Sequence, residues 1–230
     1  MKRIANLIQT KLPNYEAYAF CAYNMPYNHQ WNETKYTNWS NGTSFTNLKD
    51  QYTSVPLNRQ MIIDLFKMGY YYDAFLCAMI WGNIGTNLGG QKSFSNVFCT
   101  TNKAQVEQSV INVISLLRNR NVPQAYQSLL IGGTNKIAGI RESFFTKLLY
   151  FAGESICGLN PQPLIFDSVM HGVYNKILNI TRSLSPHGFV NVYMDYCTKM
   201  EKLRELLFLP TAGHVEALLF CPGIRHYIFH

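Results

Sequence analysis

Charged residues are scarce in this chain of 230 residues, and no stretch is apolar for long enough to cross a membrane. Only 14% of the residues are charged, against 47% that are hydrophobic, which excludes an intrinsically disordered chain. The longest nearly unbroken apolar run, Ala74 to Trp81, is far shorter than the roughly 20 residues of a membrane-spanning helix. Residues 1–15 lack the apolar core of a secretory signal. We therefore expect a folded cytoplasmic protein with no membrane partner.

Familiar metal-binding and catalytic motifs are also missing. The 6 cysteines include no CxxC pair, and the 6 histidines are scattered along the chain, whereas zinc and iron–sulfur sites use closely spaced ligands. Without a secretory signal, we interpret the cysteines as reduced thiols. GxGxxG, P-loop, HExxH and GxSxG patterns are absent. We expect no metal ion and no cofactor.

Positive charge is in excess. The chain has 20 Lys and Arg residues against 13 Asp and Glu residues, which gives a net charge of +7. A basic domain is typical of proteins that bind nucleic acid. A net charge of this size also serves solubility alone, so charge by itself leaves both interpretations open.

Hydrophobic residues recur three and four residues apart over most of the chain from Leu57 onward, the spacing of helices packed on a core. No segment shows the alternation of a strand, so the sequence predicts an all-α protein of about eight or nine helices. Residues 14–55, rich in Tyr, Asn, Trp and Thr, and residues 86–101 are expected to be mostly loop. We expect helices over about 57–69, from 70 to Gly82 or Gly85, over 103–119, 122–131 and 141–152, from 168, and over 191–207 and 213–220.

Lys147 and Asp167 are the strongest candidates for chemistry. Lys147 stands within the apolar run 144–151, and burial lowers the pKa of a lysine toward that of a neutral, nucleophilic amine. Alternatively, its side chain extends to solvent or pairs with Glu142 or Glu154. Asp167 follows an apolar extended stretch, and either Asp167 or Ser168 is expected to be the N-cap of the helix that follows. A carboxylate there also suits stabilisation of an oxocarbenium ion or activation of water.

The run GIRESFFTKLLYF, residues 139–151, and the segment LIFD, residues 164–167, resemble the helix-hairpin-helix DNA glycosylases. The resemblance is to the 8-oxoguanine DNA glycosylase branch, and within it to the compact prokaryotic members found among antiviral defences. In that family a hairpin leads into a helix with a lysine nucleophile, and an apolar segment farther along ends in the essential aspartate. The Trp81-Gly82 pair at the end of a buried helix is also similar to the family.

Two hairpin positions depart from the family pattern: Ala138 replaces a proline and Arg141 replaces the second glycine. A strict alignment of the hairpin would place Ser143 where the lysine belongs. We align on Lys147 instead, because its spacing to Asp167 fits the family.

The resemblance implies a helix-hairpin-helix glycosylase fold of two helical lobes with the active site in the cleft between them. One lobe would be about 57–155, with the hairpin and the lysine helix, and the other 1–56 plus 160–230, with the aspartate helix. It also implies roles for individual residues. The catalytic pair would be Lys147 and Asp167; the DNA contacts Gly139, Ile140, Arg141, Lys136, Ser143 and Thr146; and the base pocket Trp81, Phe144, Tyr150 and His171.

The implied function is excision of a base from double-stranded DNA, which leaves an abasic site after the nucleotide has been flipped out of the duplex. The base would be 8-oxoguanine, as in repair, or a modified cytosine of phage DNA, as in antiviral defence. The aromatic segment 23–55 could line an enlarged pocket. Two other hypotheses stay open: a non-catalytic DNA-binding module that senses modified DNA, and a helical interaction protein with a basic surface.

Overall fold

The computed structural model describes residues 1–25, 51, 57–82, 102–179 and 189–229. Within these ranges the regular elements are eleven α-helices, and there is no strand, so the predicted all-α class is confirmed. The helices are α1 Lys2–Lys11, α2 Tyr15–Asn24, α5 Arg59–Lys67, α6 Tyr71–Trp81, α8 Lys103–Arg118, α9 Val122–Leu129, α10 Glu142–Glu154, α11 Ser168–Leu178, α12 Val190–Leu207, α13 Ala212–Phe220 and α14 Pro222–Phe229.

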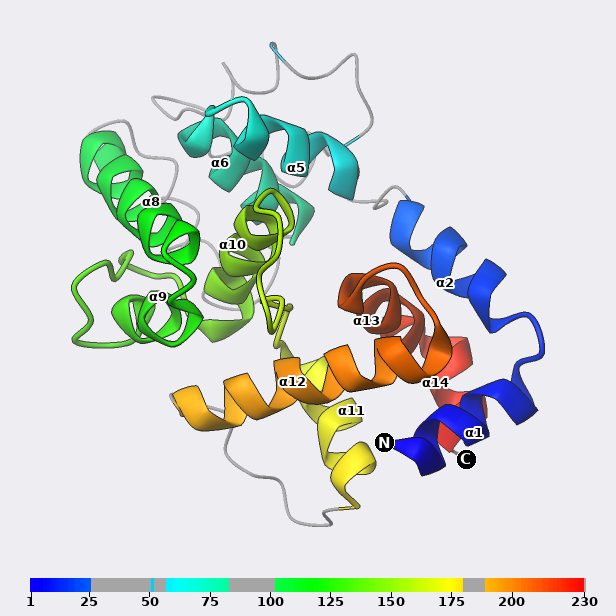
Figure 1. Ribbon diagram of the computed structural model, residues 1–230. Coiled ribbons are helices and arrows are strands. Elements are labelled where there is room, and N and C mark those ends of the chain that lie inside the picture. The colour runs from blue at the N-terminus through cyan, green and yellow to red at the C-terminus, as the bar shows by residue number, and fades with distance from the viewer. Residues whose placement is uncertain (26–50, 52–56, 83–101, 180–188, 230) are drawn as a thin grey trace.

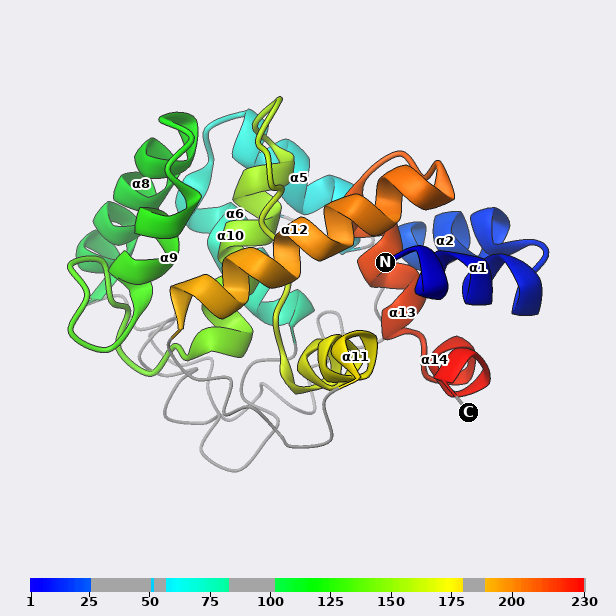
Figure 2. The ribbon, with the colours of Figure 1, turned by 60° about the horizontal axis from the view of Figure 1, so that its bottom comes forward.

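The helices form two groups, one around α10 and one around α13 (Figure 1). Helix α10 packs against α5, α6, α8 and α9, and α13 packs against α2, α11, α12 and α14. In Figure 2, α8 and α9 lie at one end of the molecule and α1, α2 and α14 at the other. The chain crosses from the first group to the second between α10 and α11. The boundaries of the two predicted lobes, and a cleft between them, stay predictions.

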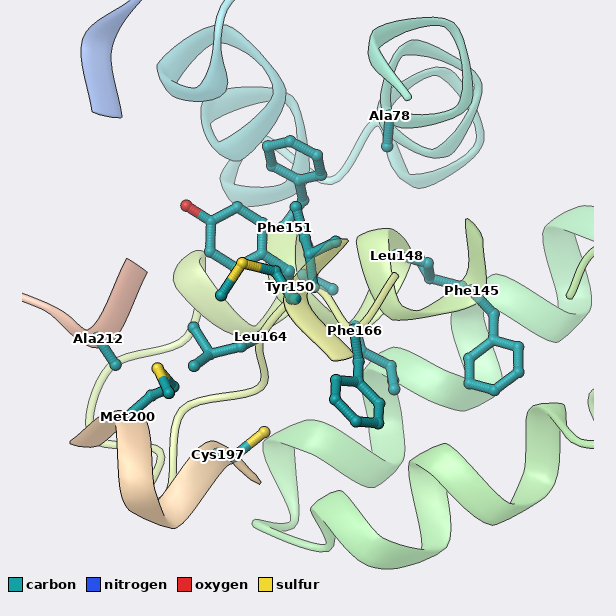
Figure 3. Close-up of a cluster of buried hydrophobic side chains, with 14 of the residues drawn as sticks. Ala78, Phe145, Leu148, Tyr150, Phe151, Leu164, Phe166, Cys197, Met200 and Ala212 are labelled. Carbon is teal, nitrogen blue, oxygen red and sulfur yellow. The ribbon is translucent and has the colours of Figure 1, made fainter. Parts of the chain in front are cut away.

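Helix α10 is buried on nearly all sides, which explains its aromatic sequence. Its Phe145, Leu148 and Phe151 side chains are at most 2% exposed. They lie in one cluster with Phe166 and with residues of α12 (Figure 3). Full burial of each such side chain contributes about 1.5–3 kcal/mol. Helix α10 therefore has a fixed position from which it can present a functional side chain.

The sequence-based interpretation missed three helices near the ends of the chain, which are α1, α2 and α14. Residues 14–24 were expected to be loop, but Tyr15–Asn24 form α2, whose small Ala19 and Ala22 are buried. Aromatic and polar residues alternate irregularly in α2, so it lacks the apolar stripe on which the prediction relied. Helix α1 has that stripe, at Ile4 and Ile8, and it was overlooked. The predicted loops over 26–55 and 86–101 lie outside the described residues, except for Gln51, which is helical.

Candidate active site

Asp167 lies where an extended segment enters α11. Its Oδ1 atom accepts hydrogen bonds from the backbone N–H groups of Val169 and Met170, both at 3.0 Å. Asp167, rather than Ser168, is thus the N-cap of α11. The partial positive charge of the helix N-terminus stabilises a carboxylate at this place. The cap fixes the carboxylate in one orientation.

Two tyrosines of α12 hold the segment that precedes Asp167. The Tyr193 hydroxyl accepts a hydrogen bond from the Leu164 N–H at 3.1 Å and donates one to the Leu164 carbonyl at 3.0 Å. The Tyr196 hydroxyl donates to the Ile165 carbonyl at 3.0 Å. Buried backbone groups need such partners, and here side chains provide what a neighbouring strand would provide in a sheet.

Thr146 joins this segment to the lysine helix. Its Oγ1 atom accepts a hydrogen bond from the Phe166 N–H at 3.1 Å and donates one to the Glu142 carbonyl at 2.7 Å. Thr146 and Phe166 each immediately precede one of the candidate catalytic residues, Lys147 and Asp167. The hydrogen bond therefore sets the register between the two residues.

Lys147 is buried in α10, with 7% of its surface exposed. Its Nζ atom donates a hydrogen bond to the Ser143 carbonyl at 2.6 Å and lies 5.2 Å from the centre of the Phe144 ring. Among the described residues it forms no ion pair with Glu142 or Glu154, the partners considered from sequence.

The surroundings of Lys147 favour the neutral amine. Burial lowers its pKa, and the positive charge of Arg59 acts in the same direction, whereas the carboxyl groups of Asp167 and Glu216 act against both. The net direction is downward. A neutral lysine amine is the form that attacks an electrophilic carbon.

Gly82, which ends α6, makes room for the Lys147 side chain. A Cβ atom placed on Gly82 would lie 2.5 Å from Lys147 Cδ and 2.7 Å from Cε. Such distances are far inside van der Waals contact. Gly82, the second residue of the Trp81-Gly82 pair that the sequence singled out by resemblance, therefore lies against the side chain of the candidate nucleophile.

Lys147 and Asp167 line the same cavity, which has a volume of about 60 Å³. Pockets that enclose a ligand have about 300–1,000 Å³, so this cavity is small by comparison. The described lining residues come from α6, α10, the segment before α11, and α13. They are Trp81, Gly82, Lys147, Ile165, Asp167, Glu216 and Phe220.

The sequence-based interpretation missed Glu216 of α13 and Arg59 of α5. Glu216 lines the cavity, is 1% exposed, and its Oε2 atom lies 3.6 Å from Arg59 Nη2. Burial raises the pKa of Glu216 to about 7, and Arg59 opposes the shift. One signal was available: the carboxyl group sits in the otherwise apolar run VEALLF. Nothing local in the sequence connects it with Arg59.

The predicted DNA-binding hairpin forms a tight turn before α10. The Ile140 N–H donates to the Ile137 carbonyl at 3.1 Å, and Gly139 has φ +82° at the third position of the turn, where type II turns need glycine. Ile137 and Ile140 are buried, whereas Lys136, Gly139 and Arg141 are exposed. The turn thus presents two cationic side chains and a glycine to solvent.

Several predicted site residues neither line the cavity nor lie on the exposed surface of the turn. Thr146 is fully buried, so its hydroxyl does not face DNA, and the Ile140 N–H is used within the turn. Phe144 packs under the Lys147 amine, and His171 packs edge-on against Phe166. Tyr150 is fully buried beside Arg59. Of the predicted base-pocket residues, Trp81 lines the small cavity, while Phe144, Tyr150 and His171 are not among its described lining residues.

The described part of the chain holds no group of three or more His, Cys, Asp or Glu side chains that could bind a metal ion. None of its helices is both long and apolar enough to cross a bilayer.

The helical fold and a cavity shared by a buried lysine and a helix-capping aspartate fit the class of protein that the resemblance implied. A model of the OGG family, described as "Putative 8-oxoguanine DNA glycosylase OGG-like protein", matches residues 22–220. The chain belongs to this family, as predicted, and membership indicates a DNA glycosylase whose partner is DNA. Searches of curated proteins and of solved structures found no match.

Proposed function

We propose that the protein excises a damaged or modified base from double-stranded DNA, with Lys147 and Asp167 as its catalytic residues. The observation that supports this most directly is that both side chains line one cavity in a chain of the glycosylase family. The exposed cationic turn at Lys136 and Arg141 would contact phosphates.

In the proposed reaction the bond between the base and C1′ of the deoxyribose breaks, and its electron pair leaves with the base. The sugar develops oxocarbenium character, and the Asp167 carboxylate stabilises that positive charge. The neutral Lys147 amine attacks C1′ and forms a C–N bond. The amine then loses a proton, and the C1′–O4′ bond breaks as O4′ takes up a proton, which leaves a protonated Schiff base. Loss of a proton from C2′ expels the 3′ phosphate by β-elimination and so breaks the DNA strand.

Trp81 and Phe220 would flank the flipped base, since both line the cavity and aromatic faces stack on bases. Glu216 would face an edge of the base. We propose 8-oxoguanine and the modified cytosines of phage DNA as the two substrate classes to compare. The first corresponds to repair and the second to antiviral defence.

The first test measures abasic sites and strand breaks on three DNAs: an unmodified duplex, a duplex with 8-oxoguanine, and phage DNA with modified cytosines. Asp167→Asn should reduce base release by about a hundredfold or more, because it removes charge stabilisation in the transition state. Lys147→Ala should abolish strand breaks and the covalent complex that borohydride traps from the Schiff base.

The DNA that yields abasic sites identifies the substrate class. Abasic sites on intact strands in the wild-type protein would assign attack to water and remove the nucleophile role from Lys147. Salt-sensitive binding without base release from any of the three DNAs would contradict the glycosylase proposal and support the non-catalytic sensor.

A further inference from the structure

Arg59 is buried directly behind the cavity. It is the first residue of α5 and is only 5% exposed. Its Nη1 atom donates hydrogen bonds to the carbonyls of Ala22 and Tyr23, at 3.4 Å and 3.3 Å, near the end of α2. Its Nη2 atom lies 3.6 Å from Oε2 of Glu216 on α13. One guanidinium group thus connects three helices.

Three aromatic rings surround the same guanidinium. Its central carbon lies 4.8 Å from the centre of the Trp81 ring, 5.5 Å from Tyr23 and 5.8 Å from Tyr150. A planar guanidinium can stack on rings while its N–H groups bind acceptors in the ring plane, and a lysine ammonium cannot do both. The Arg59 side chain is therefore held in one position.

Two cationic side chains, Arg59 and Lys147, act on the carboxyl group of Glu216. Glu216 lines the cavity together with Lys147, and its Oε2 atom also lies 3.6 Å from Arg59 Nη2. The Glu216 Oε2 atom is buried and accepts no hydrogen bond from any residue that the structure describes. The ion pair with Arg59 is what holds this oxygen. Asp167, the other carboxyl group at the cavity, is already held by its cap on α11.

Among the described residues, Arg59 and Lys147 are the cations whose charges act most strongly on Glu216, and the tyrosine, carboxyl and imidazole groups nearby add no further cation. Tyr23, Tyr150 and Tyr196 are phenols whose pKa values are raised by burial. Glu154 is a carboxyl group whose pKa burial raises to about 7. His214 stacks on Tyr23 at 4.0 Å, and burial lowers its pKa to about 4, so it is neutral at pH 7.

We propose that Arg59 is a positioning residue for Lys147: by holding the Glu216 carboxylate in an ion pair, it keeps that carboxylate from pairing with the Lys147 amine across the cavity. This inference deepens the proposed function, on which it rests for its relevance to base excision. Its test does not use DNA.

The direction of the effect follows from the charges around Lys147. Without Arg59, a cation that repels the protonated Lys147 amine is lost, and Lys147 becomes the described cation with which Glu216 can pair, as a carboxylate formed by transfer of its proton to the amine. Both changes stabilise the protonated amine and raise the pKa of Lys147. Each pH unit by which the titration midpoint rises lowers the neutral fraction about tenfold below the midpoint.

Reductive methylation of the intact protein measures this neutral fraction. Formaldehyde condenses with a neutral amine and loses water to give an imine, and cyanoborohydride then transfers a hydride to the imine carbon and leaves a methylamine. Mass spectrometry of the peptide that contains Lys147 gives its methylation rate from pH 6 to pH 10. Formaldehyde is small enough for a cavity of about 60 Å³.

We expect Arg59→Met to raise the midpoint for Lys147 by about one pH unit, so that methylation at pH 7 slows about tenfold. Adding Glu216→Gln to Arg59→Met should bring the midpoint back toward that of the wild type. The control is Arg118→Met: Arg118 also donates to a tyrosine hydroxyl, that of Tyr71, and contacts its ring at 5.6 Å, but it lies at the surface. It should leave the midpoint unchanged.

An unchanged midpoint in Arg59→Met would overturn the proposal. So would a raised midpoint that Glu216→Gln does not lower, because the effect would then come from general disruption. If Arg59→Met does not fold, Arg59→Gln, which keeps an N–H donor for the α2 carbonyls but carries no charge, is compared with Arg59→Gln/Glu216→Gln under the same criteria. If Lys147 shows the expected shifts while no DNA loses a base, the proposed function fails and the positioning role stands.

Discussion

At the scale of single residues, the position of Lys147 depends on the absence of a side chain at Gly82. The lysine stem passes so close to this glycine that even one methyl group would overlap it. A lysine displaced by about 1 Å would no longer meet a reacting carbon in line, and misplacements of this size cost up to about a hundredfold in rate.

We therefore predict that Gly82→Ala lowers the rate of base release and of borohydride trapping at least about tenfold, while the protein stays folded. Single-turnover kinetics with the DNA identified in the first test would measure this. Gly172→Ala on α11 is the matched control, because a Cβ atom there would meet nothing within 4 Å. Equal rates in the two variants would show that Gly82 has no part in placing the lysine.

At the level of single residues, the sequence was informative where the role of a residue depends on its immediate neighbours in the chain. Of the two cap candidates, Asp167 and Ser168, Asp167 is the N-cap. Of the two interpretations of Lys147, the structure shows the buried side chain and not the one that extends to solvent or pairs with Glu142 or Glu154. Glu216 and Arg59 could not be paired from sequence, because they lie 157 positions apart and are brought together by the packing of α2 against both α5 and α13. The catalytic roles themselves stay predictions.

At the scale of elements, the segment before α11 is placed by side-chain hydroxyls, and Thr146 is the one that belongs to the lysine helix. Thr146→Val keeps the shape of the side chain but leaves the buried Phe166 N–H without an acceptor. We predict a loss of about 1–3 kcal/mol in the free energy of unfolding, together with slower base release, because Asp167 loses its register with Lys147.

Thermal or urea unfolding and single-turnover kinetics would measure the two effects. Thr198→Val on α12 serves as the comparison, since the exposed Thr198 hydroxyl likewise donates to a carbonyl one turn earlier, that of Met194. It should change stability by no more than about 0.5 kcal/mol. If Thr146→Val behaved like Thr198→Val, the hydroxyl would not be what positions the segment.

The elements that sequence predicted well are those with a continuous apolar face or an apolar circumference, such as α8 and α10. The missed helices at the chain ends owe their stability to neighbours. Helix α14 has a single buried residue, Ile228, and the Lys11 ammonium of α1 binds the carbonyls of Tyr227 and Ile228 at its end. Such stabilisation comes from residues more than 200 positions away and leaves no local pattern.

At the scale of the whole molecule, the net charge of +7 would make binding to DNA sensitive to salt. A protein that neutralises several phosphates loses affinity linearly on a log–log plot, with a slope of about −0.9 for each phosphate. We predict that Lys136→Ala and Arg141→Ala each reduce this slope by about one, whatever the sequence of the DNA.

Fluorescence anisotropy with a labelled duplex at several salt concentrations would measure the slope. Lys202→Ala is the control, because Lys202 is an exposed lysine of α12 that pairs with Glu205. A slope reduced equally by Lys202→Ala would mean that the turn at 136–141 is not a specific phosphate contact.

The hydrogen bond between Thr146 and Phe166 has a consequence for how sequences of this kind can vary. It ties the two candidate catalytic residues together from the positions just before them, so the number of residues between Lys147 and Asp167 is not itself a chemical requirement. Relatives could lengthen or shorten the connection after α10 and keep the same site, provided that a hydroxyl stands before the lysine. A search for distant members of the family should therefore allow gaps in this connection and none within the pairs Thr146-Lys147 and Phe166-Asp167.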